Sequence, residues 1–556
     1  MEPVFPWLKN YPQGVNPSIG PLEFSSLPEL FRKASSGYKD RVAFENMGVS
    51  MSFGKTDELS DAFAAWLQQD LKLKKGDRIA IQMPNLLQFP VAFIGALKAG
   101  LIVVNTNPLY TPREMEHQFC DAGISAIVIV ENFASNLQQI RNKIPDCKII
   151  LTSMGDMLGF KGLLVNFVVR KIKKLVPAYS LPGAITFNAV LKKGKKLKLN
   201  TVEFNAEDVA VLQYTGGTTG ISKGAQLSHR NLITHNQMIH EWFKPYLDRK
   251  REDIIITALP LYHIFALTVN GLLMYYSGVK NVLITNPRDI PGFVKELKKH
   301  KFTILTGVNT LFNGLLNNPD FASLDFSQLH GAIGGGMAVQ DAVARKWLQV
   351  TGQPLVEGYG LSETSPVLCC NPLDGTQRIG TIGIPVSSTE VAVFDDDGNK
   401  LTAGQTGEIC ARGPQVMRGY WQKDNTGVFF GDWFRTGDIG YMDEDGFFRI
   451  VDRKKDMIKV SGFNVFPNEI ENVLAGNPKV LEVACIGIPD EKSGEVIKAF
   501  IVKRDESLTE QEVKEFCHLN LTNYKVPKFV VFRKELPKTN VGKILRRQLK
   551  EEEQKK

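Results

Sequence analysis

The sequence predicts an α/β protein with a large N-terminal part and a small α+β domain at its C-terminal end. With 556 residues, the chain is longer than a single hydrophobic core usually supports. From about residue 42 to residue 152, short apolar runs alternate with segments of helical periodicity, which is typical of largely parallel sheets. A second alternation, from about residue 480 to residue 533, is long enough for a domain of its own.

The expected elements follow in chain order. DRVAFEN (40–46) reads as a short strand, and residues 57–71 carry apolar side chains at helical spacing. After these, a helix at 227–243 and a strand at 329–337 that runs into three glycines are expected towards the middle of the chain. Between the first two elements and this helix, the sequence predicts a helix at 89–100 and strands at 78–83, 101–107, 126–130, 148–152 and 208–213.

Three features bound the class of protein. Seven cysteines without paired spacing indicate reduced thiols in a cytosolic protein rather than a disulfide framework or a zinc site. The N-terminus has no basic start and no apolar run, so no signal peptide is expected. The uncharged stretch 254–279 is long enough for a membrane span, but Pro260, His263, Asn270 and Gly271 interrupt it, which favours a buried strand, loop and helix.

The net charge of +8 is concentrated in one segment. Residues 157–202 contain ten Lys or Arg and no Asp or Glu. Within this segment, 158–177 combines lysines with Leu, Val, Ile and Phe, so a helix here could place apolar groups in an anionic membrane. The alternative is a surface helix packed on its own domain with a solvated basic face. A nucleic-acid role is disfavoured, since interleaved stacking platforms are missing elsewhere.

The stretch 214–225, YTGGTTGISKGA, is the strongest local signal. Its glycines let the backbone present N–H groups to an anion, and its hydroxyl groups and Lys223 add donors and charge. It is not a Walker A loop, because Lys223 is followed by Gly224. The stretch predicts a polyphosphate-binding loop of another kind.

Three later motifs supply polar groups that suit a nucleotide. In LVEGYGLSET (355–364), Tyr359 offers a ring and Glu363 a carboxylate for a hard cation such as Mg²⁺. GDWFRTGD (431–438) ends in Asp438, and a buried carboxylate suits the two hydroxyls of a ribose. IVDRKKDMIKVSGFNVFPNE (450–469) contains a dense charge cluster, and PKTNVGKILRRQL places Lys543 after a glycine.

In this order, the motifs resemble those of the acyl-adenylate-forming superfamily, which includes acyl-CoA synthetases, aryl-CoA ligases, luciferases and adenylation domains. The resemblance covers essentially the whole chain and is strongest to bacterial long-chain fatty acyl-CoA synthetases. It implies an adenylate-forming domain at 1–451, a hinge at 452–455 including Asp452 and Lys455, and a mobile C-terminal domain at 456–556.

The resemblance also implies residue roles. Thr218 and Glu363 would approach Mg²⁺ and take part in catalysis with Lys543, the expected catalytic lysine. Tyr359 would pack on adenine and Asp438 would accept the ribose hydroxyls. The residues expected to bind ATP are Thr215, Gly216, Gly217, Thr218, Thr219, Gly220, Lys223, Gly335, Gly336, Glu357, Gly358, Tyr359, Gly360, Thr364, Asp438, Ile450, Arg453 and Lys543. Those expected at the acyl and coenzyme A pocket are His235, His263, Phe265, Gly334, Lys459 and Gly462.

The implied reaction joins a fatty acid to ATP, giving acyl-AMP and pyrophosphate, and then transfers the acyl group to coenzyme A. Since the first step brings two anions together, positioning and charge stabilisation suffice. The alternatives are a medium-chain or aryl acid CoA ligase, an acyl-AMP ligase that loads a carrier protein, and an acyl-sensing or scaffold protein with a dead site. We further expect a role in lipid metabolism such as β-oxidation. The expected location is cytoplasmic, with peripheral contact at the inner face of the cell membrane. The sequence does not decide between a monomer and a homodimer.

Overall fold

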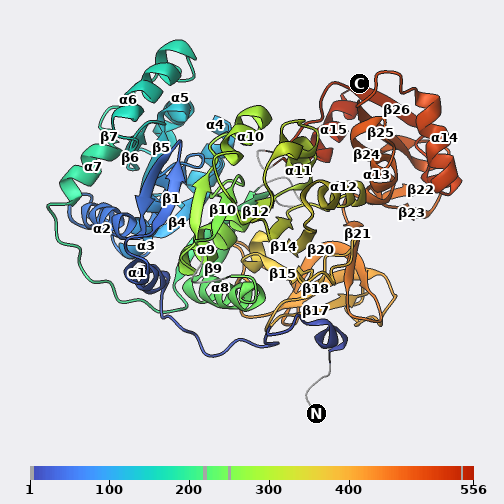
Figure 1. Cartoon of the computed structure of the whole chain (residues 1–556), viewed down its shortest axis with the longest axis horizontal. Coiled ribbons are helices and arrows are strands. Elements are labelled where there is room, and N and C mark those ends of the chain that lie inside the picture. Colours follow the sequence, from blue (N-terminus) through green and yellow to red (C-terminus); the bar gives the residue numbers. More distant parts are fainter. Residues whose placement is uncertain (1–4, 217–221, 248–251, 540–541, 556) are drawn as a thin grey trace.

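The computed structural model describes residues 5–216, 222–247, 252–539 and 542–555 (Figure 1). Strands and helices alternate as the sequence predicts, and the described residues form four sheets. Three of them build the N-terminal part, and the fourth belongs to the C-terminal domain at the right-hand end of Figure 1. The α/β fold with a small α+β C-terminal domain is therefore confirmed.

A seven-stranded sheet contains most of the strands predicted from the first half of the chain. Its order is β7-β6-β5-β3-β4-β8-β9, and all pairs are parallel except β8 with β9. Its strands are β3 (Arg78–Gln82), β4 (Ile102–Asn105), β5 (Ala126–Val130), β6 (Lys148–Thr152), β7 (Ile185–Thr186), β8 (Val209–Gly216) and β9 (Ser222–Ser228). The helices of this region are α2 (Phe53–Gln69), α3 (Gln88–Lys98), α4 (Pro112–Ala122), α5 (Ala134–Gln139), α6 (Phe160–Phe167) and α7 (Phe187–Gly194).

A nine-stranded sheet lies beside it. Its order is β16-β15-β14-β13-β12-β10-β11-β1-β2. The strands are β1 (Val42–Asn46), β2 (Val49–Ser52), β10 (Ile254–Thr257), β11 (Lys280–Leu283), β12 (Ile304–Gly307), β13 (Gly331–Gly334), β14 (Leu355–Gly360), β15 (Val367–Cys370) and β16 (Ile384–Pro385). Its helices are α1 (Leu27–Gly37), α8 (His229–Phe243), α9 (Met274–Tyr276), α10 (Ile290–Leu297), α11 (Asn309–Leu316) and α12 (Asp341–Thr351).

The last two sheets meet where the N-terminal part ends. The third sheet contains β17 (Glu390–Phe394), β18 (Gly407–Arg412), β19 (Phe429–Phe430), β20 (Trp433–Met442) and β21 (Phe448–Arg453). The C-terminal sheet contains β22 (Ile458–Val460), β23 (Phe463–Val465), β24 (Val480–Asp490), β25 (Gly494–Lys503) and β26 (Phe529–Arg533), with α13 (Pro467–Ala475), α14 (Glu510–Asn520) and α15 (Arg546–Gln554).

Three local expectations need refinement. The stretch 254–279 forms β10, a π-helix at Ala266–Leu273 and α9, and no described helix has the length and apolarity to cross a membrane. In the 214–225 stretch, the strands extend further than expected, because Thr215 pairs with Lys223 and Gly216 with Ser222 across the β8–β9 hairpin. The charge cluster at 452 begins inside β21, where Asp452 is fully buried rather than in a solvated loop.

The basic segment packs on its own domain and also exposes apolar side chains. Helix α6 and the π-helical turn at Val168–Ile172 project at the upper left of Figure 1. Phe160, Leu163 and Leu164 are 93%, 70% and 65% exposed. The helix contacts its own domain through the side that carries small and polar residues such as Gly162, and its apolar side faces solvent, so both interpretations of the segment stay open.

Candidate functional site

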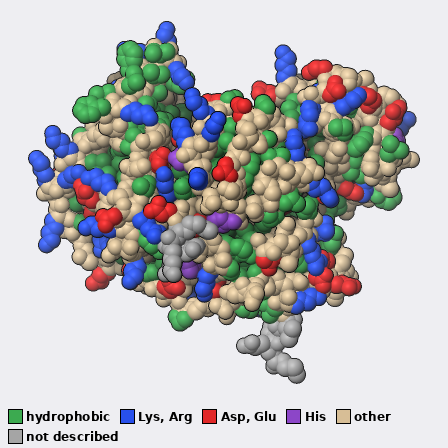
Figure 2. All heavy atoms as spheres, viewed as in Figure 1, with side chains coloured by type: hydrophobic (Ala, Val, Ile, Leu, Met, Phe, Trp, Pro, Cys, Tyr) green, Lys and Arg blue, Asp and Glu red, His purple; other side chains and the backbone are tan. Residues whose placement is uncertain are grey.

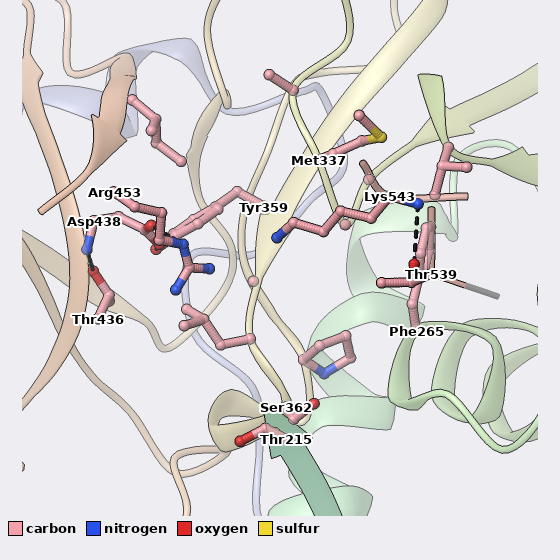
Figure 3. Close-up of a pocket in the computed structure, with 18 of the residues that line it drawn as sticks. Thr215, Phe265, Met337, Tyr359, Ser362, Thr436, Asp438, Arg453, Thr539 and Lys543 are labelled. Atoms are coloured by element: carbon pink, nitrogen blue, oxygen red, sulfur yellow. Dashed lines mark hydrogen bonds and ion pairs between the residues drawn. The ribbon is translucent and has the colours of Figure 1, made fainter. Parts of the chain in front are cut away.

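A cavity of about 2300 Å³ lies where the large sheets, the third sheet and the C-terminal domain meet. Its lining gathers motifs that are up to 328 residues apart in the chain, from Thr215 to Lys543 (Figure 3). The sequence-predicted residues that line it are Thr215, Lys223, His263, Phe265, Gly335, Gly336, Glu357, Gly358, Tyr359, Gly360, Glu363, Asp438, Ile450, Asp452, Arg453, Lys455 and Lys543.

Asp438 lies at the left of the cavity in Figure 3, almost completely buried. Strand β20 presents it opposite Arg453 of β21, which is the register expected of adjacent antiparallel strands. The Arg453 Nε atom lies 2.6 Å from Asp438 Oδ1, and the Tyr359 hydroxyl donates to Asp438 Oδ2 at 2.6 Å. The Asp438 backbone N–H donates to Thr436 Oγ1 at 3.1 Å. These bonds fix a carboxylate, a guanidinium and an aromatic ring around one point.

Glu363 lies in the turn that follows β14 and is buried. The hydroxyl groups of Thr215 and Tyr420 both donate to its Oε1 atom, at 3.2 and 2.8 Å. A carboxylate held beside a threonine hydroxyl is an oxygen donor set of the kind that Mg²⁺ prefers. Thr218, the second predicted metal ligand, lies outside the described residues, as do Gly217, Thr219 and Gly220.

Lys543 reaches the cavity from the C-terminal domain. A tight turn holds its backbone, since Lys543 N–H donates to Thr539 Oγ1 at 3.1 Å and Thr539 N–H donates to the Lys543 carbonyl at 2.7 Å. Its side chain extends into the cavity toward Tyr359 and Arg453 (Figure 3). Surrounding protein atoms and then the charge of Arg453 lower the pKa of Lys543 to about 8, although its side chain is open to the cavity. The ammonium therefore stays the main form at neutral pH.

Two other cavity residues have shifted pKa values that reduce their charge. Burial raises the pKa of Glu357 to about 8, so its carboxyl group is mostly protonated at neutral pH. Burial, followed by the charge of Lys543, lowers the pKa of His263 to about 4, so its imidazole is neutral there. Consequently, Glu357 and His263 contribute little charge to the cavity at neutral pH.

One part of the cavity lining is apolar. It comes from α8, from the segment that follows β10, and from strands of the nine-stranded sheet. A surface of this kind suits a hydrocarbon chain rather than a charged group. The side chains are Ile239, Trp242, Phe243, Leu259, Ile264, Phe265, Val269, Ile333 and Val367.

Five predicted residues lie away from the cavity lining, and a sixth, Gly216, lies next to a lining residue. His235 is buried behind it, where its Nε2 atom accepts the Val367 N–H at 3.2 Å. Gly334 is buried at the end of β13, and the Thr364 hydroxyl bonds to the carbonyls of its own turn. Lys459 and Gly462 lie exposed on the β22–β23 hairpin of the C-terminal domain. Gly216 ends β8 beside the cavity residue Thr215.

Tyr420 and Arg546 are missed by the sequence reasoning. The Tyr420 ring lies 5.3 Å from Lys223 Nζ while its hydroxyl bonds to Glu363, so it connects the 214–225 stretch to the carboxylate. Arg546 reaches Asp452 at 3.2 Å and Glu471 at 2.6 Å, which ties α15 to the end of β21. Arg546 lies in the motif PKTNVGKILRRQL, but the role of neither residue could be identified from the sequence, because each acts through partners distant in the chain.

Comparison with known proteins places these features in context. The family model described as "AMP-binding enzyme" matches residues 31–421, and that described as "AMP-binding enzyme C-terminal domain" matches residues 469–543. The chain is 56% identical to a long-chain-fatty-acid–CoA ligase of Escherichia coli O157:H7, over 98% of both chains. It is 57% identical to the protein of that name in Yersinia pestis, again over 98% of both chains.

A solved structure has the same fold. An anthranilate CoA ligase in complex with anthranoyl-AMP superimposes with a TM-score of 0.84, covering 96% of this chain and 98% of the other, at 24% sequence identity. At that identity the likeness concerns the fold alone.

Proposed function

Since this chain belongs to the AMP-binding enzyme family, we propose that it is a long-chain-fatty-acid–CoA ligase. It activates a fatty acid with ATP to acyl-AMP and pyrophosphate, and then forms acyl-CoA, a thioester that β-oxidation consumes. The observation that carries this proposal is the cavity in which Lys543, Asp438 and Glu363 face a partly apolar wall. The full-length similarity to long-chain-fatty-acid–CoA ligases supports the choice of substrate.

The first half-reaction needs two anions to approach each other, and the cavity supplies the charge to allow it. Lys543, a compact and mobile cation, stabilises the negative charge that develops between the fatty carboxylate and the α-phosphate. Asp438 holds the ribose hydroxyls, and Arg453 orients Asp438 and reaches the ribose or phosphate. Lys223, with the backbone of the 214–225 stretch, holds the outer phosphates. Tyr359 and Glu357–Gly360 border the adenine.

Magnesium is the second part of the proposal. Glu363 would hold the ion, together with Thr218 and with the hydroxyl of Thr215 close by. When bound, Mg²⁺ neutralises phosphate charge. The protein contributes the fixed orientation of the Glu363 carboxylate, which the Tyr420 hydroxyl and Thr215 hydroxyl set through Oε1.

The second half-reaction requires the lysine to leave the site so that a thiol can enter. We assign the division of the chain to 1–451 and 456–556, with rotation about 452–455. This division is consistent with β21 ending at Arg453 and the C-terminal sheet starting at Ile458. Rotation would bring the exposed β22–β23 hairpin, with Lys459 and Gly462, toward the cavity and coenzyme A.

A pyrophosphate-release assay tests the proposal. The purified protein receives ATP, Mg²⁺ and a panel of carboxylates from acetate to oleate plus coumarate, with and without coenzyme A. We expect release to be strongest with long-chain acids, and acyl-CoA to form only when coenzyme A is added. Release confined to coumarate or short acids would overturn the long-chain substrate. Transfer to a carrier protein, without dependence on coenzyme A, would indicate an acyl-AMP ligase.

The location proposed for this enzyme is the surface of an anionic membrane, reached through α6. Phe160, Leu163, Leu164 and Phe167 recur at helical spacing, so they form one stripe on the solvent side of the helix. Figure 2 has hydrophobic side chains gathered at the tip where Figure 1 places α6, with Lys and Arg side chains at its border. An exposed apolar stripe of this kind is typical of a docking surface.

The protein holds α6 firmly while leaving this stripe exposed. Gly162 and Gly155 touch so closely that a Cβ atom on Gly155 would lie 2.2 Å from the Gly162 carbonyl oxygen. Arg170 pairs with the buried Glu131 at 2.8 Å, and Asn166 Oδ1 accepts the Gly155 N–H at 2.7 Å. Because lysines surround the stripe and acids are absent from 157–202, a second copy would bring like charges together, whereas anionic lipid would be attracted.

The double variant Leu163→Ser/Leu164→Ser should bind anionic vesicles at least tenfold more weakly. Each leucine side chain that leaves lipid loses about 1.5–3 kcal/mol of transfer free energy. Co-sedimentation with vesicles of 30% phosphatidylglycerol in phosphatidylcholine at low salt measures the effect. Leu519→Ser is the matched control, since Leu519 is 84% exposed on the C-terminal domain. Equal retention of the double variant, or no retention of the unaltered protein, would contradict membrane docking by α6.

A further inference from the structure

Among the described residues, three hydrogen bonds of one kind attach the C-terminal domain to the large N-terminal part near Lys543. In each, a side chain of the N-terminal part donates to a backbone carbonyl of the C-terminal domain. Thr310 Oγ1 donates to the Gly542 carbonyl at 2.9 Å, Asn313 Nδ2 to the Leu481 carbonyl at 3.0 Å, and Arg288 Nη2 to the Thr539 carbonyl at 3.2 Å.

Two of these donors come from α11, which is rigidly placed. Asn309, at the start of the helix, exchanges two 3.0 Å hydrogen bonds with Gln340. On the buried side, Phe312 packs edge-on against Trp347 with ring centroids 4.9 Å apart. Thr310 and Asn313 are three residues apart, so they share a face of the helix, and both reach the C-terminal domain. The face of α11 that carries these two donors is therefore held in a fixed position.

The contact at Gly542 is the one closest to the chemistry. Gly542 directly precedes Lys543 and has a φ of +83°, a conformation that favours glycine. A Cβ atom at this position would lie 2.5 Å from Thr310 Oγ1, so the backbone and the hydroxyl are in close approach. The Thr310 bond therefore fixes the backbone from which the Lys543 side chain extends into the cavity.

We propose that Thr310 is a positioning residue for Lys543, and that Thr310, Asn313 and Arg288 form a latch that holds the C-terminal domain in the arrangement for adenylation. This inference rests on the proposed function of Lys543. Two of the donors are neutral, and the acceptors are backbone carbonyls, which water can satisfy when the domain rotates. Such bonds favour the Lys543-in arrangement without preventing its release for the second half-reaction.

The variant Thr310→Val tests the latch, because it removes the hydroxyl and keeps the side-chain shape. Single-turnover pyrophosphate release from ATP and oleate should fall about tenfold, while thioester formation from supplied oleoyl-AMP and coenzyme A should stay within about twofold. Thr310→Ser should restore pyrophosphate release. Thr376→Val is the control, since the exposed Thr376 hydroxyl bonds to Asp374 at 2.6 Å within its own turn. Equal loss of both half-reactions, or no loss, would overturn the latch.

A measurement that does not depend on activity separates the latch from the proposed function. Hydrogen–deuterium exchange without substrates should be faster over 537–545 in Thr310→Val than in the unaltered protein, and unchanged in Thr376→Val. The Thr539 and Leu545 N–H groups, which bond within this segment to the Lys543 and Pro537 carbonyls, are the probes. If the unaltered protein releases no pyrophosphate, the proposed function fails, while faster exchange still supports the latch and unchanged exchange overturns it.

Discussion

Replacing Lys543 with alanine should slow pyrophosphate release by about 10²–10³-fold, the size of effect seen when one preorganised charge-stabilising group is removed. Lys543 is the cation that the C-terminal domain extends toward Tyr359 and Arg453, and its lowered pKa of about 8 leaves it charged at neutral pH. The loss should be confined to adenylation. Thioester formation from supplied acyl-AMP should stay within about twofold, because in the proposed domain rotation the lysine leaves the site for that half-reaction.

The control and the conservative variant sharpen this test. Lys534→Ala removes an exposed lysine from the same domain and should leave both half-reactions unchanged. Lys543→Arg keeps the charge but replaces a compact ammonium by a planar guanidinium, so adenylation should recover only in part. If Lys543→Ala impaired both half-reactions equally, its role as a catalytic group for adenylation would be contradicted.

Part of the candidate site could be predicted because its motifs are local in sequence. Tyr359 lies near the end of β14, which runs parallel to β13, so it comes to the edge of the sheet where ligands usually bind. Asp438 lies inside the antiparallel strand β20, and its motif, not its place in a sheet, made it a candidate. The alternation of strands and helices could also be predicted from the sequence, because buried parallel strands read as short apolar runs. The motifs therefore predicted polar residues such as Lys543, Asp438 and Glu363, which the structure brings to one cavity, but most of the other lining residues were not predicted.

The features that the sequence did not predict depend on which side of a helix or strand packs against the rest of the protein. The spacing of Leu163, Leu164 and Phe167 predicts an amphipathic helix, but periodicity cannot indicate that its apolar side faces solvent. Contact between Gly155 and Gly162 decides this, because it brings the opposite side of the helix against the protein. Likewise, no local pattern marks Thr310, whose partner lies 232 residues away in the chain.

A long-range partner also explains why His235 does not line the cavity. The family resemblance implied a pocket residue, yet the structure buries His235 against β15. Burial lowers the pKa of His235 to about 3, so the ring is neutral and accepts a backbone N–H. A histidine in this environment contributes to the wall of the site through packing and a single hydrogen bond.

Glu363→Gln should reduce Mg²⁺-dependent pyrophosphate release by about 10²-fold, or about 3 kcal/mol of transition-state stabilisation. The substitution removes the charge but keeps an oxygen that accepts the hydroxyl groups of Thr215 and Tyr420, so the turn after β14 should stay folded. The loss would then report on the metal and not on the scaffold.

Titration of Mg²⁺ at saturating ATP distinguishes the loss of a metal ligand from damage to the surrounding structure. The concentration of Mg²⁺ needed for half-maximal release should rise in Glu363→Gln, whereas calorimetric binding of ATP without Mg²⁺ should stay nearly constant. Glu390→Gln is the matched control, since Glu390 pairs with Arg412 at 2.9 Å in the third sheet. An unchanged Mg²⁺ dependence would contradict Glu363 as a ligand. Because the Tyr420 hydroxyl fixes the same carboxylate, Tyr420→Phe should shift the Mg²⁺ dependence in the same direction by a smaller factor.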